Sequence, residues 1–408
     1  MKDRIHLFLQ HAFRAGVLLT LFIAPTQWSW QPRPKFNLSL ADLSLALTAG
    51  AWLLDVLLRR EWRRLKPPPC AQVLFVLAAG LSFAVAQDKA FAAKDIVQLV
   101  EFFIVGHVVF AAFLREQKGA LRQSLAVLFV ATAVNVGIAA AQYFSGEGVM
   151  QVRGTFGNRN VLGGYLALAL PMALGVMLGV RQVWAKAALG LLLAAGFLVN
   201  LSGASYFAVA GVVACMAARR GHKVFIPVAA CLLLAQVFVL PNLPRENDVE
   251  HFWSVALYDG DGVATKRYPE WQAAYNTVLT HPWLGVGMGN YQKRVGEFYD
   301  NVPQRTGPSE ADTQNLYLVL AVSAGFPALL LFIVFLGGAV RKARAAAAHG
   351  AGFQSALGLG VGGALTAFAF AAVWHPLIVR GIGLPLVFAL ALAQCLAGQG
   401  AVKNDSGK

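Results

Sequence analysis

The sequence predicts an all-α polytopic membrane protein with about 12 transmembrane helices. Two observations predict this fold class. The 408 residues are 57% hydrophobic but only 13% charged, whereas soluble globular proteins carry roughly 25% charged residues. In addition, apolar runs of about 20 residues recur from end to end, and each is long enough to cross a bilayer core of roughly 30 Å.

The apolar runs define the expected spans. The first one continues to Trp28 without a small-residue cleavage site, so we interpret it as a span rather than a cleavable signal. The spans divide the chain into 1–240 with spans 1–9, a large loop at 241–313, and 314–408 with spans 10–12 and a tail. The expected spans are 8–28, 40–58, 70–87, 95–114, 123–143, 161–180, 184–201, 204–218, 222–240, 314–340, 352–374 and 381–398.

Clusters of basic residues orient these spans. Each cluster follows an even-numbered span, so all of them lie on one side, which the positive-inside rule assigns to the cytoplasm. Both termini are then cytoplasmic, and the large loop is periplasmic in a bacterial inner membrane. The net charge of +14 therefore does not predict a nucleic-acid partner. The clusters are Arg59, Arg60, Arg63, Arg64 and Lys66; Arg115, Lys118 and Arg122; Arg181 and Lys186; Arg219, Arg220 and Lys223; and Arg341, Lys342 and Arg344.

The sequence of the loop between spans 9 and 10 predicts that this loop forms a small helical cap over a cavity. Its stretch Tyr268–Val278 places aromatic and apolar residues at helical spacing, which predicts an amphipathic helix. Gly285, Gly287 and Gly289 follow and predict a tight turn. This glycine run does not predict a nucleotide site, because no strand precedes it.

The first candidate motif is RGTFGNRNVLGGYLALALP, which starts at Arg153. Arg153 and Arg159 lie where a helix enters the membrane from outside, and Asn158 and Asn160 flank Arg159 and could cap that helix. A helix N-terminus with nearby guanidinium groups suits a phosphate. The alternative is that these residues anchor and cap the helix without binding a substrate.

The second motif is KRYPEWQAAYNTVLTHPWLGVGMGNY, which starts at Lys266. Lys266 and Arg267 are adjacent cations that could bind a diphosphate. Tyr268 and Trp271 could then support a sugar or a lipid. The alternative is a solvated charge pair on an amphipathic helix.

The third motif is DTQNLYLVLAVSAGFPALLLF, which starts at Asp312. Asp312, Thr313, Gln314 and Asn315 lie at the outer mouth of span ten. They could line an active site, or they could cap the helix that follows.

Ionisable residues inside the membrane indicate function by default. Glu101 and His107 are expected at depth, but they lie six residues apart and do not share a helix face. His375 and Arg380 are expected in the last outward turn. Proton-coupled transport would need more such groups near the midplane. No Cys or His spacing indicates a metal site.

Together the three motifs resemble the bacterial O-antigen ligase and O-antigen polymerase family, which are C-type membrane glycosyltransferases. The resemblance implies a GT-C-like fold and a periplasmic cavity for an undecaprenyl-diphosphate-linked glycan donor. An acceptor hydroxyl would attack the anomeric carbon, and the lipid diphosphate would leave. The resemblance implies no metal and no cofactor. It also implies that Arg153, Arg159 and Arg267 stabilise the charge that grows on the diphosphate.

The chain departs from this family at three positions. Ligases typically have His-Asn where this chain has Gln314 and Asn315, and glutamine cannot accept a proton near neutral pH. Ligases also often have an arginine at the position of Gly203 and a glutamate at that of Ser323. Asp312 beside Gln314 is the preferred substitute base. Other titratable groups in the same loop are Glu270, His251 and His281.

These departures favour a polymerase-like enzyme, which moves a growing glycan onto the next lipid-linked repeat. The alternative is a ligase that moves the finished glycan to lipid A core or another acceptor. A second alternative is a transporter or a scaffold without catalytic activity. The expected partners are the lipid-linked glycan donor, a glycan or lipid acceptor and the bilayer.

Overall fold

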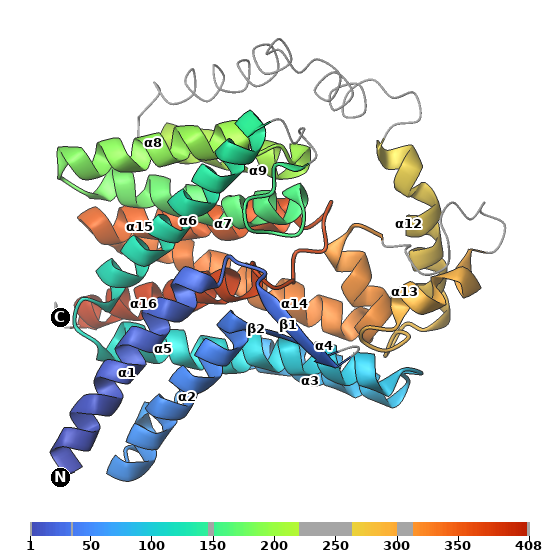
Figure 1. Cartoon of the computed structure of the whole chain (residues 1–408), viewed down its shortest axis with the longest axis horizontal. Helices are drawn as coiled ribbons and strands as arrows, with labels where there is room; N and C mark the ends of the chain where they lie inside the picture. Colours follow the sequence, from blue (N-terminus) through green and yellow to red (C-terminus); the bar gives the residue numbers. More distant parts are fainter. Residues whose placement is uncertain (1, 34–35, 146–150, 220–262, 300–312, 406–408) are drawn as a thin grey trace.

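The computed structural model describes residues 2–33, 36–145, 151–219, 263–299 and 313–405. Within these residues the chain forms a bundle of helices (Figure 1). Seven described helices are long and apolar enough to cross a membrane, and four shorter apolar helices lie among them. The chain is therefore a multi-pass membrane protein, as the composition predicts.

A described helix overlaps each expected span except the ninth, at 222–240, which lies outside the described residues. A π-helical segment, Glu101–Gly106, joins α4 and α5 into one continuous helix. The helices are α1 (Lys2–Ile23), α2 (Leu40–Arg59), α3 (Cys70–Leu81), α4 (Lys89–Val100), α5 (His107–Glu116), α6 (Ala120–Ser145), α7 (Arg159–Gly179), α8 (Val183–Val199), α9 (Gly203–Arg219), α12 (Val263–Thr280), α13 (Tyr291–Arg294), α14 (Leu316–His349), α15 (Gly352–Ala371) and α16 (Gly383–Asp405).

A β-hairpin between α1 and α2 makes the all-α prediction incomplete. β1 (Ser29–Arg33) and β2 (Phe36–Ser39) pair antiparallel, with Ser29 opposite Ser39. The first helix ends at Ile23, five residues short of the expected boundary at 28. Pro25 and Pro32 have no backbone N–H to continue a helix, so the chain turns back as a hairpin before α2 begins.

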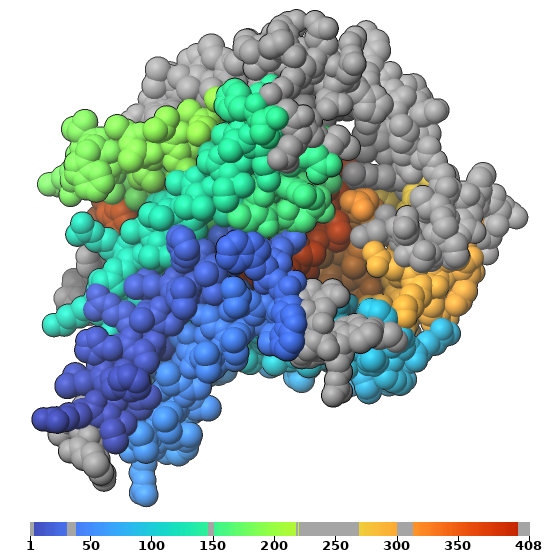
Figure 2. All heavy atoms as spheres, in the orientation of Figure 1, coloured from blue at the N-terminus to red at the C-terminus, as the bar shows by residue number. Residues whose placement is uncertain are grey.

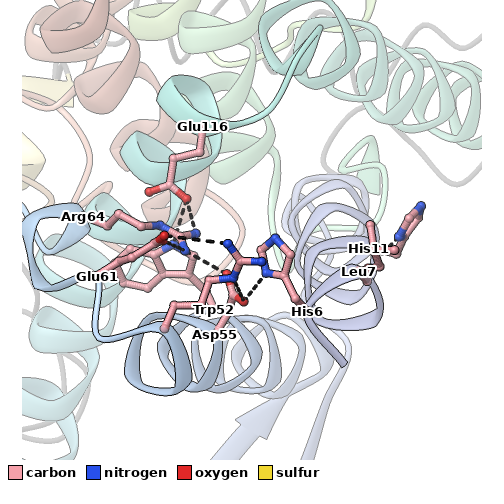
Figure 3. A network of polar contacts seen from close by, with 9 residues as sticks. His6, Leu7, His11, Trp52, Asp55, Glu61, Arg64 and Glu116 are labelled. Atoms are coloured by element: carbon pink, nitrogen blue, oxygen red, sulfur yellow. Dashed lines mark hydrogen bonds and ion pairs between the residues drawn. The ribbon is translucent and has the colours of Figure 1, made fainter. Parts of the chain in front are cut away.

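One end of the bundle carries the basic clusters, and we call it the basic end. Both termini lie on this side, at the left of Figure 1. Here Arg64 bonds both Asp55 of α2 (2.8 Å) and Glu116 of α5, and Asp55 also pairs with His6 of α1 at 2.6 Å (Figure 3). Because α1 and α2 project beyond the other helices (Figure 2), this network fastens the projecting pair to α5.

Helix α7 is the buried centre of the bundle and packs against α8, α9 and α15. Small residues allow this close packing, as is usual for helices in lipid. Gly175 of α7 faces Gly360 of α15 so closely that a Cβ on Gly175 would lie 2.6 Å from the Gly360 Cα. The start of α7 is therefore held at a fixed position at the opposite end of the bundle, which we call the far end.

The far end is covered by α12, α13 and the turn between them. The expected amphipathic helix at Tyr268–Val278 is confirmed, and it begins earlier, at Val263. The expected tight turn is also confirmed, since Gly285, Gly287 and Gly289 all have positive φ. This turn is fixed to the kinked helix α14 because Val286 N donates to Val322 O at 2.8 Å.

Candidate functional site at the far end

The first predicted segment is organised by the N-terminus of α7. Asn158 is the N-cap, and its side chain accepts a hydrogen bond from Val161 N at 3.0 Å. The capping role is therefore confirmed for Asn158. Asn160 lies inside the first turn of α7 and is not the cap residue. Arg159 is the first residue of the helix, and its side chain is half-buried there.

The loop before α7 is clamped to α6. Gln142 Oε1 accepts from the backbone N–H of Arg153 (3.0 Å) and of Gly154 (2.8 Å). Asn135 Oδ1 accepts from Thr155 Oγ1 at 2.6 Å. The backbone of Arg153 is thus fixed while its side chain is exposed and donates to Gly157 O at 3.4 Å. This geometry presents a guanidinium group beside a helix N-terminus.

At the far end, Arg153 differs from Lys293 and Arg294, which are paired with carboxylates. Lys293 pairs with Asp88 at 2.8 Å, and Arg294 pairs with Glu297 at 2.7 Å. The hydrogen bond from Arg294 lowers the pKa of Glu297, so this pair is ionised at neutral pH. Arg153 contacts no carboxylate among the described residues. Its charge is therefore available to an anion.

The second predicted segment begins in the first turns of α12. The backbones of Lys266, Arg267 and Tyr268 lie there, and their side chains are outside the described part of the structure. Their roles in binding the diphosphate and the glycan stay predictions. The described part of α12 shows how the helix is anchored to the rest of this end.

Trp271 joins α12 to two other segments. Its Nε1 donates to Thr313 O at 2.8 Å, and its ring lies 5.8 Å from the ring of Trp374. The second and third predicted segments therefore meet at this indole. A glycan contact by Trp271 stays a prediction, and such a contact would have to use the ring, because the indole N–H is already bonded.

The third predicted segment turns sharply before α14. Gln314 has φ of 51°, a left-handed conformation that is uncommon for residues other than glycine. Asn315 is the N-cap of α14 and accepts from Tyr317 N at 2.9 Å and Leu318 N at 3.2 Å. The capping alternative is therefore confirmed for Asn315. Asp312, the preferred base, lies outside the described residues.

The turn between α15 and α16, residues 372–382, connects these segments, and we call it the 372–382 turn. Ala372 O accepts from Leu316 N at the start of α14 (2.9 Å). His375 Nε2 lies 3.1 Å from Ser202 Oγ, and both residues are buried. The sequence places His375 in this turn, but no local pattern predicts its contact with Ser202.

Ser202 in turn lies against α7. A Cβ on Gly163 would come within 2.6 Å of Ser202 Cβ and 3.0 Å of Asn200 Oδ1. Gly163 lies four residues after Arg159, which is about one helical turn. The pair of His375 and Ser202 therefore lies about one turn from the predicted phosphate-binding helix start.

The 372–382 turn is also fixed by charge. Arg380 Nε donates to Asp42 Oδ2 at 3.0 Å, and Arg380 O accepts from Gln27 Nε2 at 2.9 Å. Gln27 Oε1 accepts from Gly157 N at 2.6 Å, beside the start of α7. The α1–α2 connection, the loop before α7 and the 372–382 turn thus form one rigid polar assembly.

The two deep ionisable residues have separate partners, as expected from their spacing. His107 bonds Gln394 at 2.7 Å and Gln72 at 3.2 Å inside the bundle. Glu101 lies in the π-helical segment, on the side of Asp42 and Arg380. Among the described residues, no group of His, Cys, Asp and Glu side chains is arranged to hold a metal ion.

A family model described as O-antigen ligase matches residues 159–333. Over these residues the chain is similar to O-antigen ligases. No curated protein matches the chain. The O-antigen ligase match begins at Arg159 and ends within α14, so it contains the starts of α7, α12 and α14. It confirms the resemblance to this family of glycan-transferring membrane enzymes. The loop before α7 with Arg153, and the 372–382 turn with His375, lie outside the match.

Proposed function

We propose that this protein transfers glycan from an undecaprenyl-diphosphate-linked oligosaccharide at the periplasmic face of the bacterial inner membrane. One observation carries the proposal. The start of α7, the start of α14, helix α12 and the 372–382 turn all meet at the far end of the bundle, away from the basic clusters. The positive-inside rule makes this far end periplasmic.

The chemistry requires stabilisation of a leaving diphosphate. The acceptor oxygen forms a bond to the anomeric carbon, the bond from that carbon to the diphosphate oxygen breaks, and the electron pair stays on the diphosphate. Arg153 and Arg159 at the start of α7 and Arg267 on α12, with Lys266 beside it, are the cations assigned to this charge. Fixed cations act strongly in a site that excludes water.

The proton of the acceptor hydroxyl must also be taken up. Asp312 is the candidate from the sequence, with Gln314 orienting the hydroxyl. His375 is a second candidate. It contacts Ser202, which packs against α7. It also lies next to Trp374, whose ring contacts that of Trp271 on α12, and Trp271 in turn bonds Thr313. An imidazole titrates near neutral pH and is the commonest general base in enzymes.

We propose polymerisation rather than ligation, because Gln314 and Gly203 stand where ligases typically have histidine and arginine. A ligase that transfers the finished glycan to lipid A core or another acceptor is the alternative. Asn158, Asn160, Tyr268, Trp271 and Asn315 are the residues assigned to the glycan and the lipid.

Purified protein in lipid nanodiscs, supplied with undecaprenyl-diphosphate-linked glycan, tests the proposal. Longer lipid-linked products identify a polymerase, and transfer to an added second acceptor identifies a ligase. If no product forms with the donor alone or with the added acceptor, both the polymerase and the ligase assignments are contradicted, and a transporter or scaffold is favoured. Lys186→Ala, an exposed change at the basic end, is the matched control and should turn over like the wild type.

A further inference from the structure

Helix α12 and the turn after it expose a row of large apolar side chains. Tyr275, Leu279 and Trp283 are 56%, 61% and 75% exposed. Tyr275 and Leu279 lie four residues apart on one side of α12, and Trp283 follows in the turn after the helix. The opposite side is buried through Ala273 and Thr277. Contiguous apolar patches of this kind are rare on surfaces that face water, and they mark sites that bind a partner or a membrane.

The row continues onto the outer surface of α14. Phe326 N donates to Pro282 O at 2.8 Å, so Trp283 lies beside Phe326. Phe326 is 54% exposed and Leu330 is 49% exposed on the same helix. Exposed apolar residues on a membrane-spanning helix face lipid. The row on α12 is therefore continuous with a lipid-facing surface.

The depth of Trp283 in the bilayer follows from the length of α14. Arg341, in the last basic cluster, marks the inner boundary of the hydrocarbon core. From Phe326, just after the kink at Gly325, to Arg341 the helix rises by 15 residues, or about 22 Å at 1.5 Å per residue. A hydrocarbon core of roughly 30 Å therefore extends about 8 Å beyond Phe326, and Trp283 beside it lies in the outermost part of the core, close to the outer interface.

The orientation of α12 keeps the rest of the row at a similar depth. Figure 1 shows α12 running across the direction of α7, α8 and α15 at the far end of the bundle. Little of its length thus lies along the membrane normal. Tyrosine and tryptophan side chains are enriched at the interface between lipid headgroups and hydrocarbon.

We propose that α12 is an interfacial helix whose row Tyr275–Leu279–Trp283 inserts into the outer leaflet of the bilayer. Helices with one apolar side and one polar side bind membranes in this manner, parallel to the surface. The partner of this surface is the lipid itself.

One consequence rests on the proposed function. The same helix carries Lys266 and Arg267 in its first turns, about 18 Å from Leu279 at 1.5 Å per residue. A helix held parallel to the membrane keeps the backbone of these first turns at headgroup depth. The diphosphate of a lipid-linked donor lies at that depth, because its polyprenyl chain stays in the bilayer. The apolar row therefore sets the height of the predicted diphosphate-binding residues.

Spin labelling of the full-length protein in phospholipid vesicles tests the proposal. Single cysteines replace Tyr275, Leu279 or Trp283 in a background without the four native cysteines. Accessibility to oxygen, which concentrates in lipid, is compared with accessibility to a water-soluble nickel complex. The lipid reference is Leu330→Cys, and the aqueous reference is Lys118→Cys in the exposed loop between α5 and α6.

We expect Leu279→Cys and Trp283→Cys to favour oxygen, as Leu330→Cys does, and Lys118→Cys to favour nickel. Nickel-type accessibility at both Leu279→Cys and Trp283→Cys overturns the proposal. Spin–spin broadening between two labelled copies also overturns it, because the row would then be a protein interface. Neither measurement depends on catalysis, so a chain that fails to transfer glycan but shows lipid-type accessibility refutes the proposed function and not this inference.

Discussion

His375 Nε2 and Ser202 Oγ lie 3.1 Å apart, although the two residues are separated by 173 positions in the chain. Ser202 precedes Gly203, where O-antigen ligases often have arginine. The 372–382 turn that carries His375 also contacts the start of α14, beside Gln314, where they typically have histidine. A single histidine therefore lies near two positions at which the chain departs from the typical ligase sequence. On the proposed function, this placement makes His375 a candidate to receive the acceptor proton.

We predict that His375→Gln lowers glycan transfer by about 100-fold or more, the usual range for loss of a general base. Glutamine keeps a polar contact with Ser202 but cannot take up a proton. The rate is measured against pH. Transfer that depends on an unprotonated base should fall towards acid pH in the wild type, and the variant should lose this acidic limb.

The matched second variant is Gln314→His in the His375→Gln background. It restores a base at the position where ligases have one, so it should regain transfer and the acidic limb. A His375→Gln protein that keeps the wild-type rate and pH profile would show that His375 only packs against Ser202. The proton acceptor would then be sought at Asp312.

Arg267 should contribute more than Lys266 to stabilising the negative charge on the diphosphate. Arg267→Ala is expected to lower the transfer rate by about 100- to 1,000-fold, as happens when one stabilising donor is removed. A planar guanidinium can bind phosphate through two hydrogen bonds, whereas an ammonium acts as a point charge. Lys266→Ala should therefore be milder. The comparison requires equal thermal midpoints for the two variants. Normal turnover by Arg267→Ala would remove this residue from the site.

Much of the fold could be predicted because its signals are local. Apolar runs predict the helices, and glycines at 285, 287 and 289 predict a turn that the structure forms with positive φ. The caps at Asn158 and Asn315 were predicted as alternatives and are present. The β-hairpin was missed because it lies between the first two expected spans, in a short connection to which the prediction assigned no secondary structure. The contact of His375 with Ser202 depends on how distant helices pack, which a single sequence does not encode locally.

The network at the basic end should stabilise the pair α1–α2. Arg64→Ala removes hydrogen bonds to Asp55 and Glu116 and leaves these carboxylates without their shared cation. Hydrogen bonds to charged groups contribute about 1.5–3 kcal/mol, so we expect a loss of that order in the free energy of unfolding. Arg63→Ala, an exposed neighbour, is the control and should change little. Equal stability of the two variants would show that the network is dispensable.

The same network predicts how the free energy of unfolding depends on pH. Burial opposes ionisation of Arg64, but the hydrogen bonds to Glu116 and Asp55 outweigh it and raise the pKa of Arg64 above its ordinary value. A raised folded-state pKa stabilises the fold at every pH below the unfolded value, and this stabilisation is lost only in strong alkali. The contribution of Arg64 should therefore be constant between pH 6 and 9 at the precision of thermal melts. A decline within that range that is absent from Arg64→Ala would contradict this assignment.

Gly325 should be the residue of α14 that is least tolerant of a side chain. Its φ of 82° and ψ of 169° are accessible almost only to glycine, and a Cβ there would lie 2.8 Å from Leu284 N and even closer to Trp283 O. Gly325→Ala is therefore expected to lower the free energy of unfolding by about 1–3 kcal/mol and to displace the turn that holds α12 on α14.

Gly337→Ala in the same helix is the control, because nothing lies within 4 Å of its Cβ. Alanine favours helix there by about 1 kcal/mol. Thermal melts of both variants in nanodiscs measure the difference, and equal midpoints would mean that α12 is held at the far end by contacts other than this kink.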